Sequence, residues 1–422
     1  MLYFNLFVAL TSLSAYLSYC FRHIQSNVFV LITSWCIFAL IYILSIFTGP
    51  LEFIGSMHLV FSNADFYSLV VDGMLGYLLF AGCLHIDIYS FFKHLKVIAT
   101  LAIVTTLLSF VITAYLIHFV MAYMGLEHSL VSCFLYAAVI APTDPVAVLA
   151  LLKNLNLSKA LYAKIGSESL LNDGVGVVLF VSVLKFAHVS EVSAQIFYDM
   201  LAFFLFEGFL GLFFGVFIAF LMLKYSRIKT DKNMGNQNIF LLLTLLNVGY
   251  ICAKLLHFSP PLVAVGSGLY SSYIIQSLQE DSKNVIYVFW DTIDEILNYS
   301  LFFIVGFQVI FIEPNATYFV LMLLAIGVNF LVRFISVFIP LLSLKVGYSQ
   351  NTTLYKTLVM GGLKGGLSLA LALSIPRDFS NFDMIFDMTY AVVAFTVIVQ
   401  GLSIERYLKL VKSRTRMDDL VI

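Results

Sequence analysis

The chain has 422 residues, of which 61% are hydrophobic and 11% are charged. Globular proteins are about 45–50% apolar and about 25% charged, so this composition excludes a soluble enzyme and a disordered protein. The 23 basic residues face 24 acidic ones, which leaves no basic excess for binding nucleic acid. The composition therefore predicts an all-α protein that crosses a membrane many times.

About thirteen stretches are apolar and long enough for membrane-spanning helices, which need about 20 residues each. In chain order they lie near residues 3–20, 27–48, 66–88, 97–118, 130–152, 166–188, 199–223, 240–257, 260–276, 292–312, 318–341, 355–376 and 386–405. The segments between them are short, so we expect a single transmembrane domain over residues 1–422. Residues 407–422 form a short basic tail.

Lysines and arginines are distributed unevenly over the connections between these spans. The odd-numbered connections and the tail hold most of them, whereas the even-numbered connections hold only Lys185 and Arg377. Cytoplasmic loops of membrane proteins carry the excess of Lys and Arg. We therefore expect the N-terminus outside the cell and the C-terminus in the cytoplasm.

Several ionisable residues lie inside the predicted spans, where a charge costs roughly 2.5–3.5 kcal/mol and marks a functional candidate that needs a partner. They are Asp72, Asp144, Glu168, Asp173, Glu207, Lys254, Arg333 and Lys364. Asp72, Glu207 and Lys254 are close enough to span ends to reach the interface. His85 and Asp87, near the end of the third span, are also expected at the interface.

Two prolines interrupt the fifth span, at Pro142 and Pro145 around Thr143 and Asp144. Proline lacks an N–H and clashes with the carbonyl four residues earlier, so this spacing predicts an unwound segment. Freed carbonyls at membrane depth are tolerated only within protein or beside a watery cavity. There they can serve as oxygen ligands for a cation.

The start of the sixth span carries a polar cluster in the segment 166–174. Glu168 and Asn172 share one helix face, and Ser169 and Asp173 share a second face about 100° away. A helix-capping cluster uses similar residues. A cap does not need four polar groups over a turn and a half, so we favour an ion-binding function.

The twelfth span contains four glycines within residues 361–366, with Lys364 between them. Glycines are common at ordinary helix contacts, but a lysine among them favours a second broken helix. Broken helices at matching positions in two halves are typical of transporter sites. We expect inverted six-helix repeats at about 1–190 and 240–406, joined by a linker helix at about 199–223. Asp144 would balance the positive half-helix ends at the crossing, and Lys364 the negative ones.

Three motifs resemble the electroneutral monovalent-cation:proton antiporters, the bacterial NhaP and eukaryotic sodium/proton exchanger family. They are APTDPVA at 141–147, ESLLNDG at 168–174 and GGLKG at 361–365. Weaker matches lie at 78–87, 289–308, 332–337 and 399–401, in family order along nearly the whole chain. The resemblance implies a homodimer whose six-helix core moves in an elevator-like cycle of alternating access.

The resemblance also implies the roles of the residues at the crossing. Asp173 would be the carrier carboxylate that binds cation and proton in turn. Thr143, Ser169 and Asp144 would complete the cation site, and Asn172 would orient it.

For charge balance, family members pair the glutamate of the second motif with a basic residue on the twelfth span. Here this would join Glu168 to Lys364, with Arg333 as the competing partner. Lys364 stands where many members have arginine, and a lysine cannot form the two-pronged pair of a guanidinium. Ser167 replaces a usual glycine, and Ala81 stands where many members carry an acid.

The resemblance implies exchange of Na⁺ or Li⁺ for H⁺ in pH and cation homeostasis, in a bacterial inner or plasma membrane and without a cofactor. Asn172 precedes Asp173 where electrogenic relatives have a second Asp, which favours one-for-one exchange. The alternatives are a K⁺/H⁺ antiporter on the same scaffold and, more remotely, a cation channel. A membrane enzyme is disfavoured, because the chain has no HExxH or GxSxG motif.

The cysteines add little to this interpretation. None of the five forms a CxxC pair or a Cys/His spacing typical of a metal site. We expect them to be small buried hydrophobic residues.

Overall fold

The computed structural model describes residues 2–20, 26–48, 67–144, 148–149, 152, 159–186, 194–226, 235–307, 309, 315–344 and 348–414. This part of the chain is helical, and its one β-interaction is a bridge between Asp144 and Leu363. The predicted all-α class is therefore confirmed. The helices are α1 (Leu2–Cys20), α2 (Ser26–Thr48), η1 (Ser68–Met74), α4 (Leu75–Leu84), α5 (Ile88–Lys93), α6 (Leu95–Ala99), η2 (Thr100–Val104), α7 (Thr105–Tyr123), α8 (Leu130–Val139), α10 (Lys159–Lys185), α11 (Ala194–Ser226), α12 (Gly235–Leu255), α13 (Pro260–Ile275), α14 (Glu280–Phe307), α15 (Ala316–Ser343), α16 (Tyr348–Met360), α17 (Gly366–Leu373), α18 (Phe382–Phe395), η4 (Thr396–Gln400) and α19 (Gly401–Arg414).

Each predicted span coincides with one or more of these helices. Within the described ranges, six helical stretches are long and apolar enough to cross a membrane: Leu95–Tyr123, Ala163–Lys185, Tyr198–Lys224, Gly235–Leu255, Ala316–Ser343 and Phe382–Leu408. Shorter apolar helices cover Phe7–Cys20, Ser26–Ile41, Ser68–Leu84 and Leu130–Val139. The chain is thus a multi-pass membrane protein, while the count of thirteen crossings and the repeat boundaries stay predictions. The predicted tail begins inside α19, and residues 415–422 lie outside the described ones.

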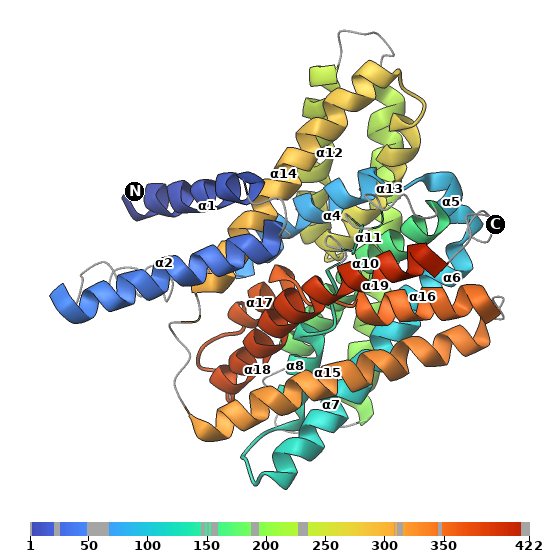
Figure 1. Ribbon diagram of the computed structural model, residues 1–422. Coiled ribbons are helices and arrows are strands. Elements are labelled where there is room, and N and C mark those ends of the chain that lie inside the picture. Colours follow the sequence, from blue (N-terminus) through green and yellow to red (C-terminus); the bar gives the residue numbers. More distant parts are fainter. Residues whose placement is uncertain are drawn as a thin grey trace.

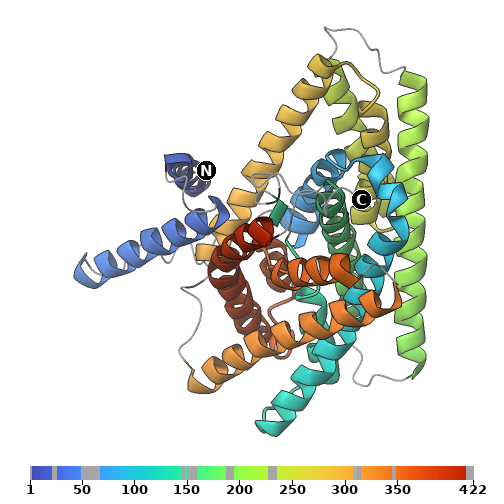
Figure 2. The ribbon, with the colours of Figure 1, turned by 45° about the vertical axis from the view of Figure 1, so that its right-hand side comes forward.

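The helices cross one another around a centre that contains α8, α10 and α17 (Figures 1 and 2). α1 and α2 extend from one side, and α11 forms a long straight edge in Figure 2. α11, which coincides with the predicted linker helix, packs closely on α13 through glycines. A Cβ at Gly215 would lie 2.3 Å from the Val263 carbonyl oxygen, and one at Gly266 would lie 2.2 Å from that of Leu212. Small residues let membrane helices approach backbone to backbone, so this contact fixes α11 on α13.

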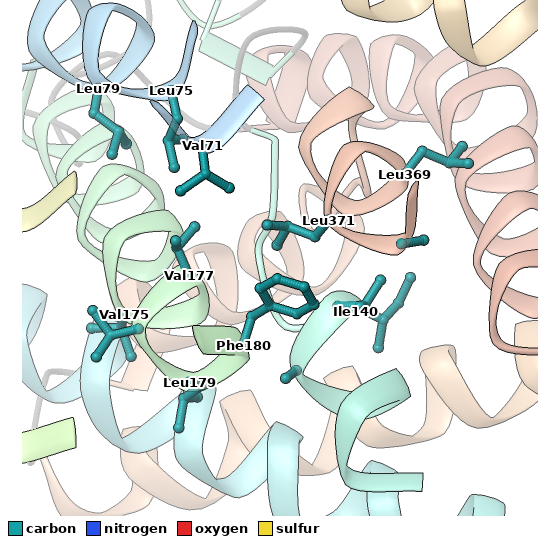
Figure 3. Close-up of a cluster of buried hydrophobic side chains, with 14 of the residues drawn as sticks. Val71, Leu75, Leu79, Ile140, Val175, Val177, Leu179, Phe180, Leu369 and Leu371 are labelled. Atoms are coloured by element: carbon teal, nitrogen blue, oxygen red, sulfur yellow. The ribbon is translucent and has the colours of Figure 1, made fainter. Parts of the chain in front are cut away.

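Apolar side chains fill the space between α10 and the neighbouring ends of α8 and α17 (Figure 3). Phe180 of α10 and Leu371 of α17 are fully buried, and Ile140 at the end of α8 is 1% exposed. Leu75 of α4 belongs to the same cluster of buried residues and lies near Val71 in Figure 3. Cores packed in this way hold few voids larger than a water molecule, so this cluster holds α10 against α8 and α17.

Candidate functional site

The fifth predicted span is broken where its sequence predicts a break. α8 ends at Val139, residues 141–143 are not helical, and helical backbone returns at 148–149. Pro142 lies in the break, whereas Pro145 lies outside the described residues. The unwound segment packs against α10 at Gly176, where a Cβ would lie 2.7 Å from Cγ of Pro142. Only glycine leaves room for this approach.

The twelfth predicted span is broken in the same way. α16 ends at Met360, and α17 begins at Gly366. Carbonyl groups freed at the end of α16 find partners in other helices, as buried backbone groups must. Gln400 Nε2 donates to the carbonyls of Val359 (3.2 Å) and Met360 (2.7 Å), and Arg333 Nε donates to that of Leu358 (3.2 Å).

The two breaks are bound to each other. The N–H of Asp144 donates to the Leu363 carbonyl at 2.8 Å. Lys364 Nζ donates to the carbonyls of Ala141 (3.2 Å) and Pro142 (3.1 Å), just beyond the C-terminal end of α8. The Asp144 carboxylate lies against Gly365, the N-cap of α17, where a Cβ would be 2.5 Å from Oδ2. The Lys364 side chain thus lies at the negative C-terminal end of α8, and the Asp144 carboxylate lies at the positive N-terminal end of α17. The sequence led us to expect this arrangement.

The polar face of α10 points at Thr143 in the first break. Asp173 Oδ1 accepts the Thr143 N–H at 3.1 Å, and Ser169 Oγ donates to the Thr143 carbonyl. Asn172 Nδ2 donates to Thr143 Oγ1 at 2.7 Å, and its own oxygen accepts from Thr106 Oγ1 at 2.5 Å. Carboxylate, hydroxyl and carbonyl oxygens therefore converge at one point, which is the chemistry that hard cations prefer.

Asp173 and Asp144 line a cavity of about 260 Å³. Both side chains are partly exposed, although they lie deep among the helices. The wall opposite α10 includes Asp291, Asp294 and Asn298 of α14. The cavity thus joins the predicted cation-site residues to two further carboxylates.

The sequence analysis missed Asp291 and Asp294. Both lie at the edge of the predicted span 292–312, whereas α14 begins at Glu280. Together with Asn298 they are spaced i, i+3 and i+7, which places them on one helix face and is the signal that identifies them. His85, expected at the interface, also lines the cavity, and its Nε2 lies 2.7 Å from Asp291 Oδ1.

Glu168 lies outside the cavity and pairs with Arg333. Its Oε1 is 3.4 Å from Arg333 Nη2, and the two side chains are 3% and 8% exposed. Among the described residues, Glu168 forms its ion pair with Arg333. The pairing with Lys364 that the resemblance implies is therefore not formed. The reason is geometric, because Lys364 points to the carbonyls at the end of α8. A Cβ at Gly362 would lie 2.5 Å from Arg333 Nε, so glycine there makes room for the guanidinium.

Thr106 and Thr396 are two supporting residues that the sequence analysis also missed. Thr106 holds the side-chain oxygen of Asn172, and Thr396 Oγ1 accepts the Lys364 N–H at 3.1 Å. Each is a single hydroxyl in an apolar span, and no local pattern distinguishes it from a threonine that bonds within its own helix.

Known proteins resemble this chain over nearly its whole length. The family described as "Sodium/hydrogen exchanger, transmembrane" matches residues 9–410. The Na(+)/H(+) antiporter NhaP of Pseudomonas aeruginosa is 31% identical over 407 residues, 94% of each chain. The Na(+)/H(+) antiporter NhaH of Halobacillus dabanensis is 28% identical over 351 residues, 82% of this chain and 83% of its own. Antiporters are secondary transporters and not enzymes.

A solved structure shares the fold. It is that of the sodium proton antiporter MjNhaP1 from Methanocaldococcus jannaschii at pH 8, with a TM-score of 0.73 over 98% of this chain and 97% of that one, at 17% identity. The helical fold of this chain is therefore one already seen in a solved structure. On the match to residues 9–410 and the identity to a full-length relative, the chain belongs to the transmembrane sodium/hydrogen exchanger family.

Proposed function

We propose that this protein exchanges Na⁺ or Li⁺ for H⁺ across the membrane, with Asp173 as the carrier carboxylate. The observation that carries the proposal is the position of Asp173. Its carboxylate lines a cavity at the crossing of two broken helices and faces the backbone of Thr143. Relatives that match most of the chain are named as Na⁺/H⁺ antiporters, which supports the same ions here.

The chemistry follows from one group with two alternative partners. A carboxylate binds either a proton or a metal cation, so the two ions compete for Asp173. Moving the bare anion through an apolar gate is expensive, whereas the neutralised form passes. This penalty prevents return of the empty carrier and couples the two fluxes.

The neighbouring residues provide the remaining oxygen ligands. The Thr143 carbonyl accepts from Ser169 and retains a second lone pair, and Ser169 Oγ itself can coordinate. Asp144 borders the same cavity and would bind the cation directly or through water. Asn172 is held between Thr106 and Thr143, so its function is to fix the geometry.

Charge balance at the crossing is a separate function, assigned to Glu168, Arg333 and Lys364. Because one carboxylate changes its charge in each cycle, exchange is one-for-one and electroneutral. Alternating access in a homodimer of inverted repeats, at about 1–190 and 240–406, completes the proposal. The distribution of lysines and arginines supports a cytoplasmic C-terminus.

The test is exchange by the Asp173→Asn variant in proteoliposomes. We expect addition of Na⁺ to collapse an imposed pH gradient with the natural protein and to have no effect with the variant. Asp383→Asn is the matched control, because Asp383 is an exposed carboxylate outside the cavity. Full exchange by Asp173→Asn would contradict the assignment.

The same vesicles separate the alternatives. A series of Li⁺, Na⁺ and K⁺ additions at several pH values distinguishes a sodium from a potassium antiporter. Cation flux without opposite proton movement would identify a channel.

A further inference from the structure

Two histidines, a cysteine and a methionine lie close together at the end of α7 and the start of α8. The turn between these two helices is at the bottom of Figure 1. His118 Nδ1 and His128 Nε2 are 2.9 Å apart, and Cys133 Sγ and one ring nitrogen from each histidine all lie within 4.8 Å of one another. The Met121 thioether sulfur is 3.9 Å from Cys133 Sγ. None of these residues lines the cavity at Asp173, so the cluster is separate from the proposed transport site.

The histidine pair is oriented for coordination. His128 Nδ1 is 2.7 Å from the Leu126 carbonyl, which accepts only, so Nδ1 carries the proton and Nε2 has a free lone pair. His118 Nδ1 therefore donates to that lone pair. A backbone carbonyl that fixes the far nitrogen in this way is typical of histidines that bind metals.

The loop that carries His128 is held from both ends. Gly125 turns the chain with a φ of +68°, and the Leu126 N–H donates to the Met121 carbonyl at 3.0 Å. Asn381 Nδ2 donates to the Glu127 carbonyl at 3.0 Å, and Ser129 caps α8. His128 is thus positioned by backbone contacts that are independent of its own side chain.

The spacing suits a tetrahedral metal ion. Two nitrogen ligands at about 2.0–2.1 Å from a tetrahedral centre are about 3.3 Å apart. The observed 2.9 Å needs only a small opening of the pair. Cys133 is fully buried and the histidines are half-buried, so the ion would be reached from the loop side and enclosed by the helices.

We propose that His118, His128 and Cys133 bind a transition-metal ion of the Zn²⁺ or Cu⁺ type, with Met121 as the fourth ligand for Cu⁺. Imidazole and sulfur select such ions, whereas Na⁺, Mg²⁺ and Ca²⁺ prefer oxygen. On binding, the His118 proton moves from Nδ1 to Nε2 and the Cys133 thiol releases its proton. The ion ties the end of α7 to the start of α8, the helix that leads into the first break.

The test uses the full-length protein in detergent, with any affinity tag removed and metals stripped by a chelator. We expect one Co²⁺ per chain, with the near-ultraviolet absorption of a cobalt–thiolate bond, and displacement by Zn²⁺. Cu⁺ under reducing conditions is the second arm, in which Met121→Leu weakens binding of Cu⁺ but not of Zn²⁺. Retained Cu⁺ affinity in Met121→Leu would remove Met121 from the set.

Cys133→Ser should abolish the thiolate band, and His128→Gln should weaken binding by about tenfold or more. Cys83→Ser is the matched control, because Cys83 is a buried cysteine on α4 far along the chain from the cluster. Size-exclusion elution checks folding of each variant. Absence of a thiolate band in the natural protein would overturn the proposal without any variant, as would unchanged binding in folded Cys133→Ser.

Discussion

Asp173 and Glu168 are two carboxylates little more than one turn apart on α10, yet their surroundings differ. Glu168 is 2% exposed and pairs with the Arg333 guanidinium. Asp173 is partly exposed to a cavity and accepts a single backbone N–H, from Thr143. In the described part of the chain no basic side chain forms an ion pair with Asp173.

Under the proposed function, this difference separates a structural charge, Glu168, from an exchangeable one, Asp173. A buried carboxylate with a fixed guanidinium partner has its counter-ion built into the protein. A carboxylate without such a partner must take its counter-ion from solution. In this proposal two carboxylates on one helix have different functions, and the residues that the neighbouring helices place beside each carboxylate determine its function.

The largest effect on stability is expected for Glu168→Gln. Removing one member of a buried ion pair leaves Arg333 uncompensated, so the free energy of unfolding should fall by about 3–5 kcal/mol. Asp173→Asn should leave stability nearly unchanged, because no fixed charge loses its partner. Thermal unfolding of both variants in detergent measures this contrast.

The double variant Glu168→Gln/Arg333→Gln is the control for that prediction. If the pair is the cause, the double variant should be more stable than Glu168→Gln alone. A well-folded Glu168→Gln protein with only a weaker apparent affinity for Na⁺ would instead give Glu168 a function like that of Asp173, and the comparison would fail.

A smaller effect, on the rate of exchange, is expected from displacing the broken segment that carries Thr143, the hydrogen-bond partner of Asp173. Gly176→Ala places a methyl group 2.7 Å from Cγ and 3.2 Å from the nitrogen of Pro142, so the broken segment must shift. A displacement of this kind should lower the rate of exchange by about tenfold or more, since reacting groups lose their alignment. Proteoliposome exchange at saturating Na⁺ measures it.

Gly327→Ala is the matched control for the steric argument. A Cβ at Gly327 of α15 meets no atom within 4 Å, so this variant should exchange at the normal rate. Equal rates for both glycine variants would mean that the position of Pro142 against α10 does not determine exchange.

The smallest effect is expected at the cavity wall. Asp294 lines the same cavity as Asp173 but lies on α14, so we expect its charge to attract cations without carrying them. Asp294→Asn should raise the Na⁺ concentration for half-maximal exchange about threefold and leave the maximal rate unchanged. Loss of the maximal rate would show that the cavity contains a second carrier carboxylate.

The sequence predicts the local features of the site well. Prolines and glycines determine where a helix breaks, so the interruptions after Val139 and after Met360 were predictable. The spacing of Ser169 and Asp173 fixes their common face on α10, and both reach Thr143. These are short-range effects that chain geometry determines without knowledge of the fold.

Partner choice was less predictable, because it depends on packing between distant helices. Both Lys364 and Arg333 were candidates for Glu168, and the positions of α15 and of the α8 end decide between them. Asp294 was missed because it lies at the edge of the predicted span 292–312, close to the polar first half of α14, which begins at Glu280. Its i, i+3, i+7 spacing with Asp291 and Asn298 indicates a common helix face, but not that this face borders the cavity at Asp173.

The bond from Lys364 to the carbonyl of Ala141 has a consequence for biosynthesis. The two residues are 223 positions apart in the chain. At about 5–20 residues per second, the ribosome needs roughly 10 to 45 seconds to make this length. During that time the carbonyl oxygens of Ala141 and Pro142 at the end of α8 lack the Lys364 side chain that later donates to them. Lipid headgroups, water or the insertion machinery must satisfy those oxygens until the second half arrives.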